Sequence, residues 1–296
     1  MNDSLIASPR PTLRDYLELV KFSHTIFALP FALASMLIAA KGWPAPHIIL
    51  WILGAMVTAR TAAMGFNRIV DRHIDAANPR TSGREIPSGK ISVGQASALV
   101  ALSAALFVFC AYQLNTLAFA LALPTLAVLF FYSFCKRFTA WSHLVLGFCL
   151  GIAPIGAWIA VRAQLEVPPI VLGAAIMFWV AGFDIIYATM DEEFDRKAGL
   201  HSMVQKLGTP AALMLARVFH LIFSGLLFLF GRLAALGGIY MAAVALIALF
   251  LVYEHAIVNP RDLRRVNAAF FTVNGAISVF FLIVVAVEVF QAGGVY

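Results

Sequence analysis

Asn67-Arg-Ile-Val-Asp71-Arg-His-Ile-Asp75 ends one long apolar segment of this chain, and Tyr187-Ala-Thr-Met-Asp191-Glu-Glu-Phe-Asp195 ends another. Both stretches contain two aspartates four residues apart. On a helix such residues lie on the same face, and like charges placed there repel each other unless a cation lies between them. Carboxylate oxygens are suitable ligands for a divalent metal ion. The two stretches therefore predict metal-binding helix ends at the edge of an apolar layer.

The composition indicates which kind of protein carries these helix ends. Of the 296 residues, 62% are hydrophobic and only 12% are charged, unlike soluble domains. About 20 consecutive apolar residues suffice to span a bilayer as a helix. The chain is therefore predicted to be an all-α polytopic membrane protein with nine transmembrane helices, at about 24–41, 46–66, 93–113, 117–134, 142–162, 168–189, 211–231, 234–254 and 268–290.

The spacing of the two acidic stretches indicates an internal repeat. From Asp71 to Asp191 the offset is 120 residues, and each stretch follows the second helix of a four-helix unit. We expect two such units and one further helix in a single transmembrane domain, 1–296, with residues 1–22 as an interfacial segment. Functional sites of repeat-built membrane proteins often lie where the repeats meet. The four carboxylates are expected to surround one cavity there.

Basic residues in short loops mark the cytoplasmic side of a membrane protein. If the N-terminus is inside, only three lie on the outer side, Lys41, Arg162 and Arg232. The predicted location is thus the inner (plasma) membrane, with both acidic stretches at its cytoplasmic face. The excess positive charge then reflects topology and an anionic ligand, and no nucleic-acid partner is expected. The cytoplasmic segments hold sixteen basic residues: Arg10, Arg14, Lys21, Arg68, Arg72, Arg80, Arg84, Lys90, Lys136, Arg137, Arg196, Lys197, Lys206, Arg261, Arg264 and Arg265.

Two long loops, 76–92 and 196–208, follow the acidic stretches. Loops of this length in compact proteins commonly act as lids or binding loops. The first combines Gly and Pro with Arg80, Arg84 and Lys90, which is the composition expected of a lid that closes on an anion. We therefore predict both loops to be cytoplasmic lids.

Charge balance indicates the ligand. Four carboxylates alone would repel a phosphorylated molecule. Two Mg²⁺ ions would cancel that charge and still offer coordination positions to phosphate oxygens. Lys136 and Arg137 add cations on the same face. We therefore expect Mg²⁺ as cofactor and a diphosphate as ligand.

Ionisable residues also occur inside the predicted spans. Arg60 shares a helix face with Asn67 and Asp71, and Asp184 shares one with Tyr187. Such residues indicate a functional site, because their burial in a bilayer is costly. An alternative is that Arg60 and Asp184 form a buried ion pair that only ties the two halves together.

Two other sets of residues are interpreted as structural. Asn267 and Asn274, seven apart in the ninth predicted span, are expected to form hydrogen bonds between helices. Cys110, Cys135 and Cys149 lack the spacing of a zinc site or a disulfide framework.

Three motifs resemble the signature of the intramembrane aromatic prenyltransferases, the 4-hydroxybenzoate polyprenyltransferase family. They are N-R-x-x-D-x-x-x-D from Asn67 to Asp75, Y-S-F-C-K-R from Tyr132 to Arg137, and D-x-x-Y-x-x-x-D-x-x-x-D from Asp184 to Asp195. The resemblance extends over essentially the whole chain. It implies transfer of a polyprenyl group from polyprenyl diphosphate to a small aromatic acceptor, with 4-hydroxybenzoate and ubiquinone or menaquinone biosynthesis expected.

The acceptor has an alternative. The segment Lys21-Phe-Ser-His24-Thr-Ile-Phe-Ala-Leu-Pro30 departs from the opening of the best-known 4-hydroxybenzoate enzymes. It is more similar to a related branch, some of whose members are assigned to the futalosine route to menaquinone. An aromatic intermediate of that route is the alternative acceptor.

The resemblance also implies roles for individual residues. Asp184 or Tyr187 would orient the acceptor, and Arg60, deeper in its helix, would meet a carboxylate on the acceptor ring. A membrane transporter with an inverted repeat is the non-enzymatic alternative, but its ionisable residues would be expected near the midplane of several spans. The implied metal ligands are Asn67, Asp71, Asp75, Asp191 and Asp195, and the implied phosphate ligands are Arg72, Arg84, Lys136 and Arg137.

Overall fold

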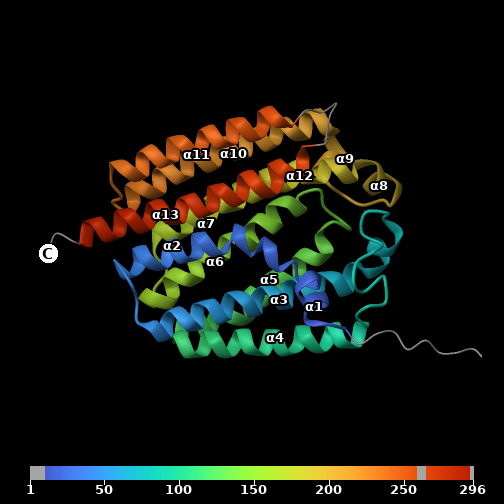
Figure 1. Cartoon of the computed structure of the whole chain (residues 1–296), viewed down its shortest axis with the longest axis horizontal. Helices are drawn as coiled ribbons and strands as arrows, with labels where there is room; N and C mark the ends of the chain where they lie inside the picture. The colour runs from blue at the N-terminus through green and yellow to red at the C-terminus, as the bar shows by residue number, and fades with distance from the viewer. Residues whose placement is uncertain (1–10, 259–264, 294–296) are drawn as a thin grey trace, which may run out of the picture.

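The computed structural model describes residues 11–258 and 265–293, and within these ranges all regular secondary structure is helical. Eight helical segments are long and apolar enough to cross a membrane, and they run side by side along the molecule (Figure 1). The predicted all-α polytopic fold is confirmed. The long helices are α3 (Pro46–Ala77), α4 (Val93–Leu114), α5 (Thr116–Cys135), α6 (Ser142–Arg162), α7 (Val167–Ala188), α10 (Thr209–Leu233), α11 (Gly238–Ile257) and α13 (Asn274–Gly293).

The predicted count of nine spans is not confirmed. The first predicted span, 24–41, consists of a 3₁₀ segment, η1 (Phe22–Phe27), and the 12-residue helix α2 (Leu29–Ala40), which is shorter than a bilayer requires. Pro30 lies in the first turn of α2, where its missing N–H interrupts no helical hydrogen bond. The α-helix therefore begins later than hydropathy alone suggests.

Short helices flank the long ones. Residues 1–10 of the expected interfacial segment lie outside the described residues, as do Arg261 and Arg264, and the described remainder forms a short helix, α1. The short elements are α1 (Leu13–Leu19), η2 (Thr189–Asp191), α8 (Glu192–Lys197), α9 (Met203–Leu207), α12 (Val266–Ala268) and the π-helical segment η3 (Ala269–Val273).

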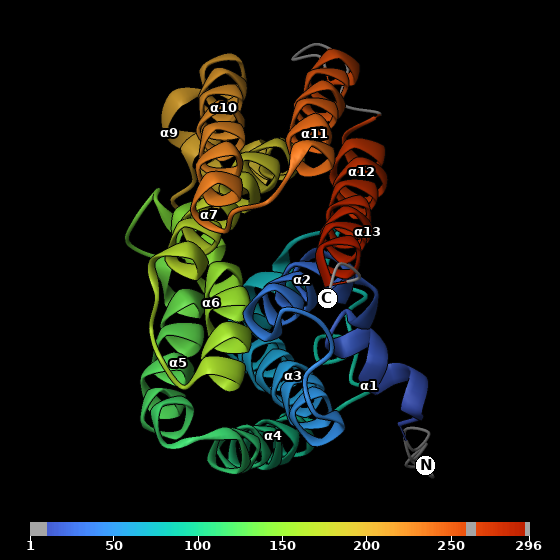
Figure 2. The same ribbon diagram turned by 90° about the vertical axis from the view of Figure 1, so that its left-hand side faces the viewer.

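The long helices follow one another around the molecule from α3 to α13 when seen nearly end-on, and α2 lies between α6 and α13 (Figure 2). Helix α6 packs against α7, α2 and α5. Two glycines four residues apart, Gly147 and Gly151, face α7, and a Cβ atom at either would overlap the carbonyl of Met177 or Gly173. Small residues at this spacing let two helix backbones approach closely.

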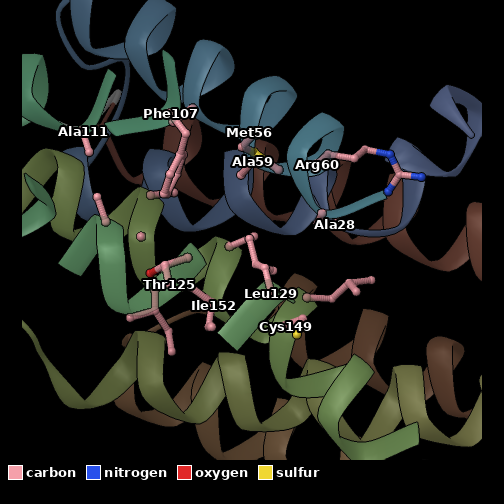
Figure 3. A pocket seen from close by; sticks show the side chains of 18 of the residues that line it. Ala28, Met56, Ala59, Arg60, Phe107, Ala111, Thr125, Leu129, Cys149 and Ile152 are labelled. Carbon is pink, nitrogen blue, oxygen red and sulfur yellow. The ribbon is translucent and has the colours of Figure 1, made fainter. Parts of the chain in front are cut away.

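An apolar cavity of about 260 Å³ lies among α3, α4, α5 and α6. Its wall runs from Ala111 at one end to Arg60 at the other (Figure 3). Asn67 and Tyr132 lie at the same end as Arg60, near the C-termini of α3 and α5. The cavity is therefore apolar along its length and polar at one end.

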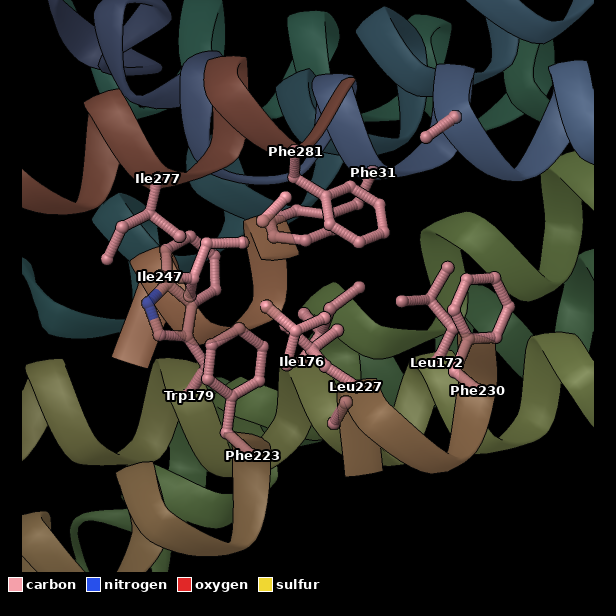
Figure 4. Packing of buried hydrophobic residues seen from close by; sticks show 14 of the residues in the cluster. Phe31, Leu172, Ile176, Trp179, Phe223, Leu227, Phe230, Ile247, Ile277 and Phe281 are labelled. Carbon is pink, nitrogen blue, oxygen red and sulfur yellow. The ribbon is translucent and has the colours of Figure 1, made fainter. Parts of the chain in front are cut away.

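The main hydrophobic core lies on the other side of α2 and α6. Phe31 of α2, Trp179 of α7, Phe223 of α10 and Phe281 of α13 meet there (Figure 4). The Trp179 ring stacks on Phe223 at a centroid distance of 5.8 Å and meets Phe31 edge-on at 5.1 Å. Such aromatic pairs contribute about 0.5–1.5 kcal/mol beyond their burial, so this core fixes α7 relative to α2, α10 and α13.

Both acidic stretches lie at one end of the molecule, here called the site end, with α8 beside the loop that follows α3 (Figure 1). Helix α3 continues to Ala77, beyond the predicted end at 66, because hydropathy identifies only its apolar part. Asp71 and Asp75 thus share one face of a continuous helix. Asp191 instead ends a 3₁₀ turn. The Thr189 hydroxyl donates to the Ile186 carbonyl at 2.6 Å, a local bond that bends helices.

The close contact of α6 and α7 can be tested with a pair of glycines. Gly147→Ala is expected to destabilise the folded protein by about 1–3 kcal/mol, since its methyl group must displace the backbone at Met177. Gly156→Ala, also in α6, has no atom within 4 Å of its added Cβ and should be neutral or slightly stabilising, because Ala favours helix. Unfolding by SDS in mixed micelles measures both, and equal midpoints would contradict the packing argument.

Candidate active site

Asp71 faces two cations from the end of α5. Its carboxylate lies 2.6 Å from Lys136 Nζ and 3.1 Å from an Arg137 nitrogen, and Asn67 Nδ2 donates to it at 3.1 Å. Arg137 is itself held by the Val70 carbonyl at 3.0 Å. Because Lys136 and Arg137 follow α5 directly, the packing of α3 beside α5 brings them to the acidic stretch.

Asp75, one turn further along α3, is also buried. Arg84, from the loop after α3, donates to it at 2.7 Å, and Arg68 lies 3.8 Å away. Arg68 was not among the predicted site residues, although it stands seven residues before Asp75 and so on the same helix face. Its Nε also donates to the Leu19 carbonyl at 3.3 Å, which ties α1 to the site.

Asp191 is bound by the same loop. Arg80 donates to both of its carboxylate oxygens, and Asn78 Nδ2 lies 3.3 Å from one of them. Arg80 also donates to the Tyr187 hydroxyl at 2.7 Å. Burial lowers the pKa of Arg80, but its hydrogen bonds to Asp191 and the charge of that carboxylate raise it above the ordinary value. The sequence predicts Arg80 only as part of a lid, because no spacing rule pairs it with Asp191.

Asp195 lies on α8, beyond Asp191, at the start of the second predicted lid. Its backbone carbonyl accepts the Leu200 N–H at 2.9 Å, and the next residue, His201, donates its N–H to the Lys136 carbonyl at 2.8 Å. The segment 196–208 is thus attached to the end of α5 and contains the short helix α9. This segment therefore has more helical structure and more backbone contacts than its polar sequence predicts.

Asp184 pairs with a histidine that the sequence did not single out. His143 Nδ1 lies 2.7 Å from the Asp184 carboxylate, and His143 Nε2 is 3.4 Å from the Met203 N–H. Because Nε2 accepts that N–H, Nδ1 donates to Asp184. Arg60 donates to the Lys21 carbonyl at 2.7 Å. Within the described residues, the alternative buried pair of Arg60 with Asp184 does not form.

The cavity and the carboxylates meet at Asn67. Its side chain lines the apolar cavity and also donates to Asp71. Arg60 lines the same cavity, and its buried Nε has no hydrogen-bond partner. An elongated apolar molecule in the cavity would thus have its end beside the cations and carboxylates. Arg72 points elsewhere, since its bond goes to the Ile69 carbonyl of its own helix at 2.9 Å.

The profile of the UbiA prenyltransferase family matches residues 28–282. The chain belongs to this family. The 4-hydroxybenzoate octaprenyltransferases of Providencia stuartii and Paraburkholderia phytofirmans are each 30% identical to it, with 80% and 86% of this chain and 82% and 90% of the relatives covered. UbiA prenyltransferases are enzymes, and this assignment replaces the transporter alternative.

Solved structures agree with the assignment. A UbiA homologue from Aeropyrum pernix K1 superimposes with a TM-score of 0.77 at 31% identity, over 91% of this chain and 98% of that one. A UbiA homologue from Archaeoglobus fulgidus, bound to GPP and Mg²⁺, superimposes with a TM-score of 0.72 at 23% identity, over 93% and 99%. With eight apolar spans among its described residues, this UbiA-family chain is an integral membrane protein.

The carboxylate oxygens of this UbiA-family site fit a hard divalent cation. Asp71 Oδ1 and Asp75 Oδ2 are buried without a hydrogen bond. The nearby nitrogens of Arg137 and Arg68, at 3.1 and 3.8 Å, give charge without hydrogen-bond geometry. Hard cations take oxygen ligands of this type. In the described part of the chain, no three acidic, histidine or cysteine side chains lie close enough together to bind one metal ion. Asp71 and Asp75 instead lie beside basic side chains.

The contact between Arg80 and Asp191 should control the mobility of the loop after α3. Arg80→Ala is expected to speed amide exchange of residues 78–82 roughly tenfold, since hydrogen bonds to a charged group contribute about 1.5–3 kcal/mol and partial exposure reduces this. Lys90→Ala removes the same charge from the exposed end of the loop and should leave exchange there unchanged. Hydrogen–deuterium exchange with mass spectrometry compares the two variants. Identical protection of residues 78–82 in both would show that the contact between Arg80 and Asp191 does not hold the loop.

Proposed function

We propose that this enzyme transfers a polyprenyl group from polyprenyl diphosphate to 4-hydroxybenzoate, at the cytoplasmic face of the inner membrane. One observation carries the proposal: Asn67 joins an apolar cavity to the carboxylate and cation cluster at the site end. A prenyl diphosphate has the same division into a long apolar tail and an anionic head. The relatives named 4-hydroxybenzoate octaprenyltransferase support this acceptor.

The metal of this proposal is Mg²⁺, held by Asn67, Asp71, Asp75, Asp191 and Asp195. Once bound, two Mg²⁺ ions would neutralise these four carboxylates and withdraw charge from the diphosphate oxygens. The two buried oxygens without hydrogen bonds, on Asp71 and Asp75, favour this assignment. They would otherwise remain buried without a hydrogen bond, which is unfavourable.

The cations would hold the leaving group. Lys136, Arg137 and Arg84 already lie within 3.1 Å of carboxylates of the acidic stretch on α3, so they could turn to a diphosphate with small movements. The allylic C–O bond breaks and its electron pair leaves with the diphosphate, whose growing charge these cations stabilise. Arg80 and Arg84, from the loop 76–92, would close this lid over the diphosphate. Arg72 would need a different rotamer to take part.

The acceptor would lie deeper than the diphosphate. Arg60 lines the cavity with a buried, unpaired Nε, which suits the carboxylate of 4-hydroxybenzoate. A ring carbon of the acceptor attacks the allylic carbon, and the ring then loses its proton from that carbon. Asp184, held by His143, and Tyr187, held by Arg80, would orient the ring.

Metal dependence and acceptor choice can be tested together. Chelation should abolish prenylation of 4-hydroxybenzoate by the purified enzyme, and Mg²⁺ should restore it. Asp71→Asn and Asp191→Asn should lower turnover roughly 100-fold or more, the usual effect of losing charge stabilisation in the transition state. A radiolabelled prenyl diphosphate with either 4-hydroxybenzoate or a futalosine-pathway aromatic compound identifies the acceptor. Full activity in excess EDTA would exclude the metal mechanism, and product only from the second compound would change the acceptor.

Arg137 and Arg60 should affect different substrates. Arg137→Ala is expected to raise KM for the prenyl diphosphate whichever acceptor is present, because Arg137 lies beside Asp71. Arg60→Ala is expected to raise KM for 4-hydroxybenzoate roughly tenfold or more, as the loss of a charged hydrogen bond would. Initial rates with each substrate varied in turn measure both. An Arg60 effect confined to the prenyl diphosphate would refute this division.

A further inference from the structure

A second buried polar cluster lies in the last three long helices, away from the cavity. Glu254 of α11 and Asn274 of α13 are both completely buried. Asn274 Nδ2 donates to Glu254 Oε1 at 2.9 Å, in agreement with the interhelical bond predicted for this asparagine. The same nitrogen lies 3.0 Å from the Ala269 carbonyl and 3.3 Å from the Phe270 carbonyl. Neither residue has a part in the proposed reaction.

The two carbonyls belong to the π-helical segment η3 (Ala269–Val273). A π-turn inserts one residue into a helix and is frequently found at functional sites. The two N–H groups of the Asn274 amide serve three acceptors, so one N–H bonds to Glu254 and the other is shared between the two carbonyls. A buried carbonyl left unpaired is unfavourable, and Glu254 holds the amide group of Asn274 in place. The pair therefore stabilises the irregular turn.

The π-turn places Phe270 against the proposed acceptor site. The Phe270 ring centroid lies 4.2 Å from that of Tyr187, and 5.3 Å from those of Phe27 and Phe183. Tyr187 in turn receives a hydrogen bond from Arg80, whose guanidinium carbon is 5.0 Å from the tyrosine ring. Phe270 is therefore the packing contact, and Arg80 the polar contact, that together determine the position of Tyr187.

The cluster is also fixed to α7. His220 Nε2 lies 3.2 Å from the Trp179 carbonyl, and His220 Nδ1 is 3.0 Å from His255 Nε2. Gly182 allows this approach, because a Cβ there would overlap the His220 ring. Helices α10, α11 and α13 are thus connected to α7, the helix that carries Tyr187. The position of the π-turn relative to the proposed site is therefore fixed.

We infer that Glu254 and Asn274 are positioning residues for the aromatic acceptor, which they affect by holding the π-turn so that Phe270 packs on Tyr187. The inference rests on the proposed function, in which Tyr187 orients the acceptor ring. In the proposed function the prenyl diphosphate would be held by the carboxylates and cations of the site end, and not by Tyr187. Loss of the pair should therefore affect one substrate and not the other.

Kinetics of three leucine variants test the inference. Asn274→Leu keeps the volume and removes the donors, and it is expected to raise KM for 4-hydroxybenzoate roughly tenfold while KM for the prenyl diphosphate stays unchanged. Phe270→Leu should act in the same way, and the double variant should add little to either change, because both act through one contact. Phe271→Leu, at the more exposed neighbouring ring, is the matched control. Equal changes in KM for the two substrates would overturn the inference. So would a double variant whose change in KM equals the combined effects of Asn274→Leu and Phe270→Leu.

A second measurement does not need turnover. With 3-fluorotyrosine at position 187, the ¹⁹F resonance should shift in Asn274→Leu and Phe270→Leu, and stay in place in Phe271→Leu. Glu254→Gln keeps an oxygen for Asn274 and should match the unaltered protein in both assays. If Asn274→Leu does not fold, Asn274→Ser takes its place. An unmoved resonance refutes the inference, whereas absence of any prenyl transfer by the unaltered protein refutes only the proposed function.

Discussion

The close approach of α6 and α7 is the constraint on which the arrangement of the site depends. Gly147 and Gly151 remove the side chains that would hold the two backbones apart. His143 lies one turn before Gly147, so the same crossing brings it to Asp184 near the end of α7. Because α6 also packs on α2 and α5, an error in this one crossing would move the wall of the cavity and the second acidic stretch together.

Charge pairing adds a second constraint at the site end. Two carboxylates take their cations from distant parts of the chain: Asp71 from the end of α5, and Asp191 from the loop after α3. A buried carboxylate without a partner is strongly destabilising. The pairs therefore fix the ends of α3, α5 and α7 relative to one another, and they do so with the groups that the proposed chemistry uses.

The sequence predicts those parts of the structure that are encoded by a periodic residue pattern or by a long apolar run. The spans follow from hydropathy, and Asp71 and Asp75 share a helix face because four residues make about one turn. The partners of these carboxylates depend on tertiary contacts, so Arg68, Asn78 and His143 were missed. The 3₁₀ turn at Asp191 comes from one hydroxyl of Thr189, too small a signal for pattern analysis. Asn274 was predicted to bond between helices, but not its partner Glu254.

Because Arg80 is bonded to Asp191, a cation can bind this carboxylate only by replacing the guanidinium group. In the proposed function, an Mg²⁺ ion that binds Asp191 must compete with a guanidinium already there, so two positive charges enter as one is released. The exchange also has a mechanical effect, because the released side chain belongs to the loop after α3. Ion affinity and loop position are thereby thermodynamically linked: whatever stabilises the open loop also tightens ion binding, by the same free energy.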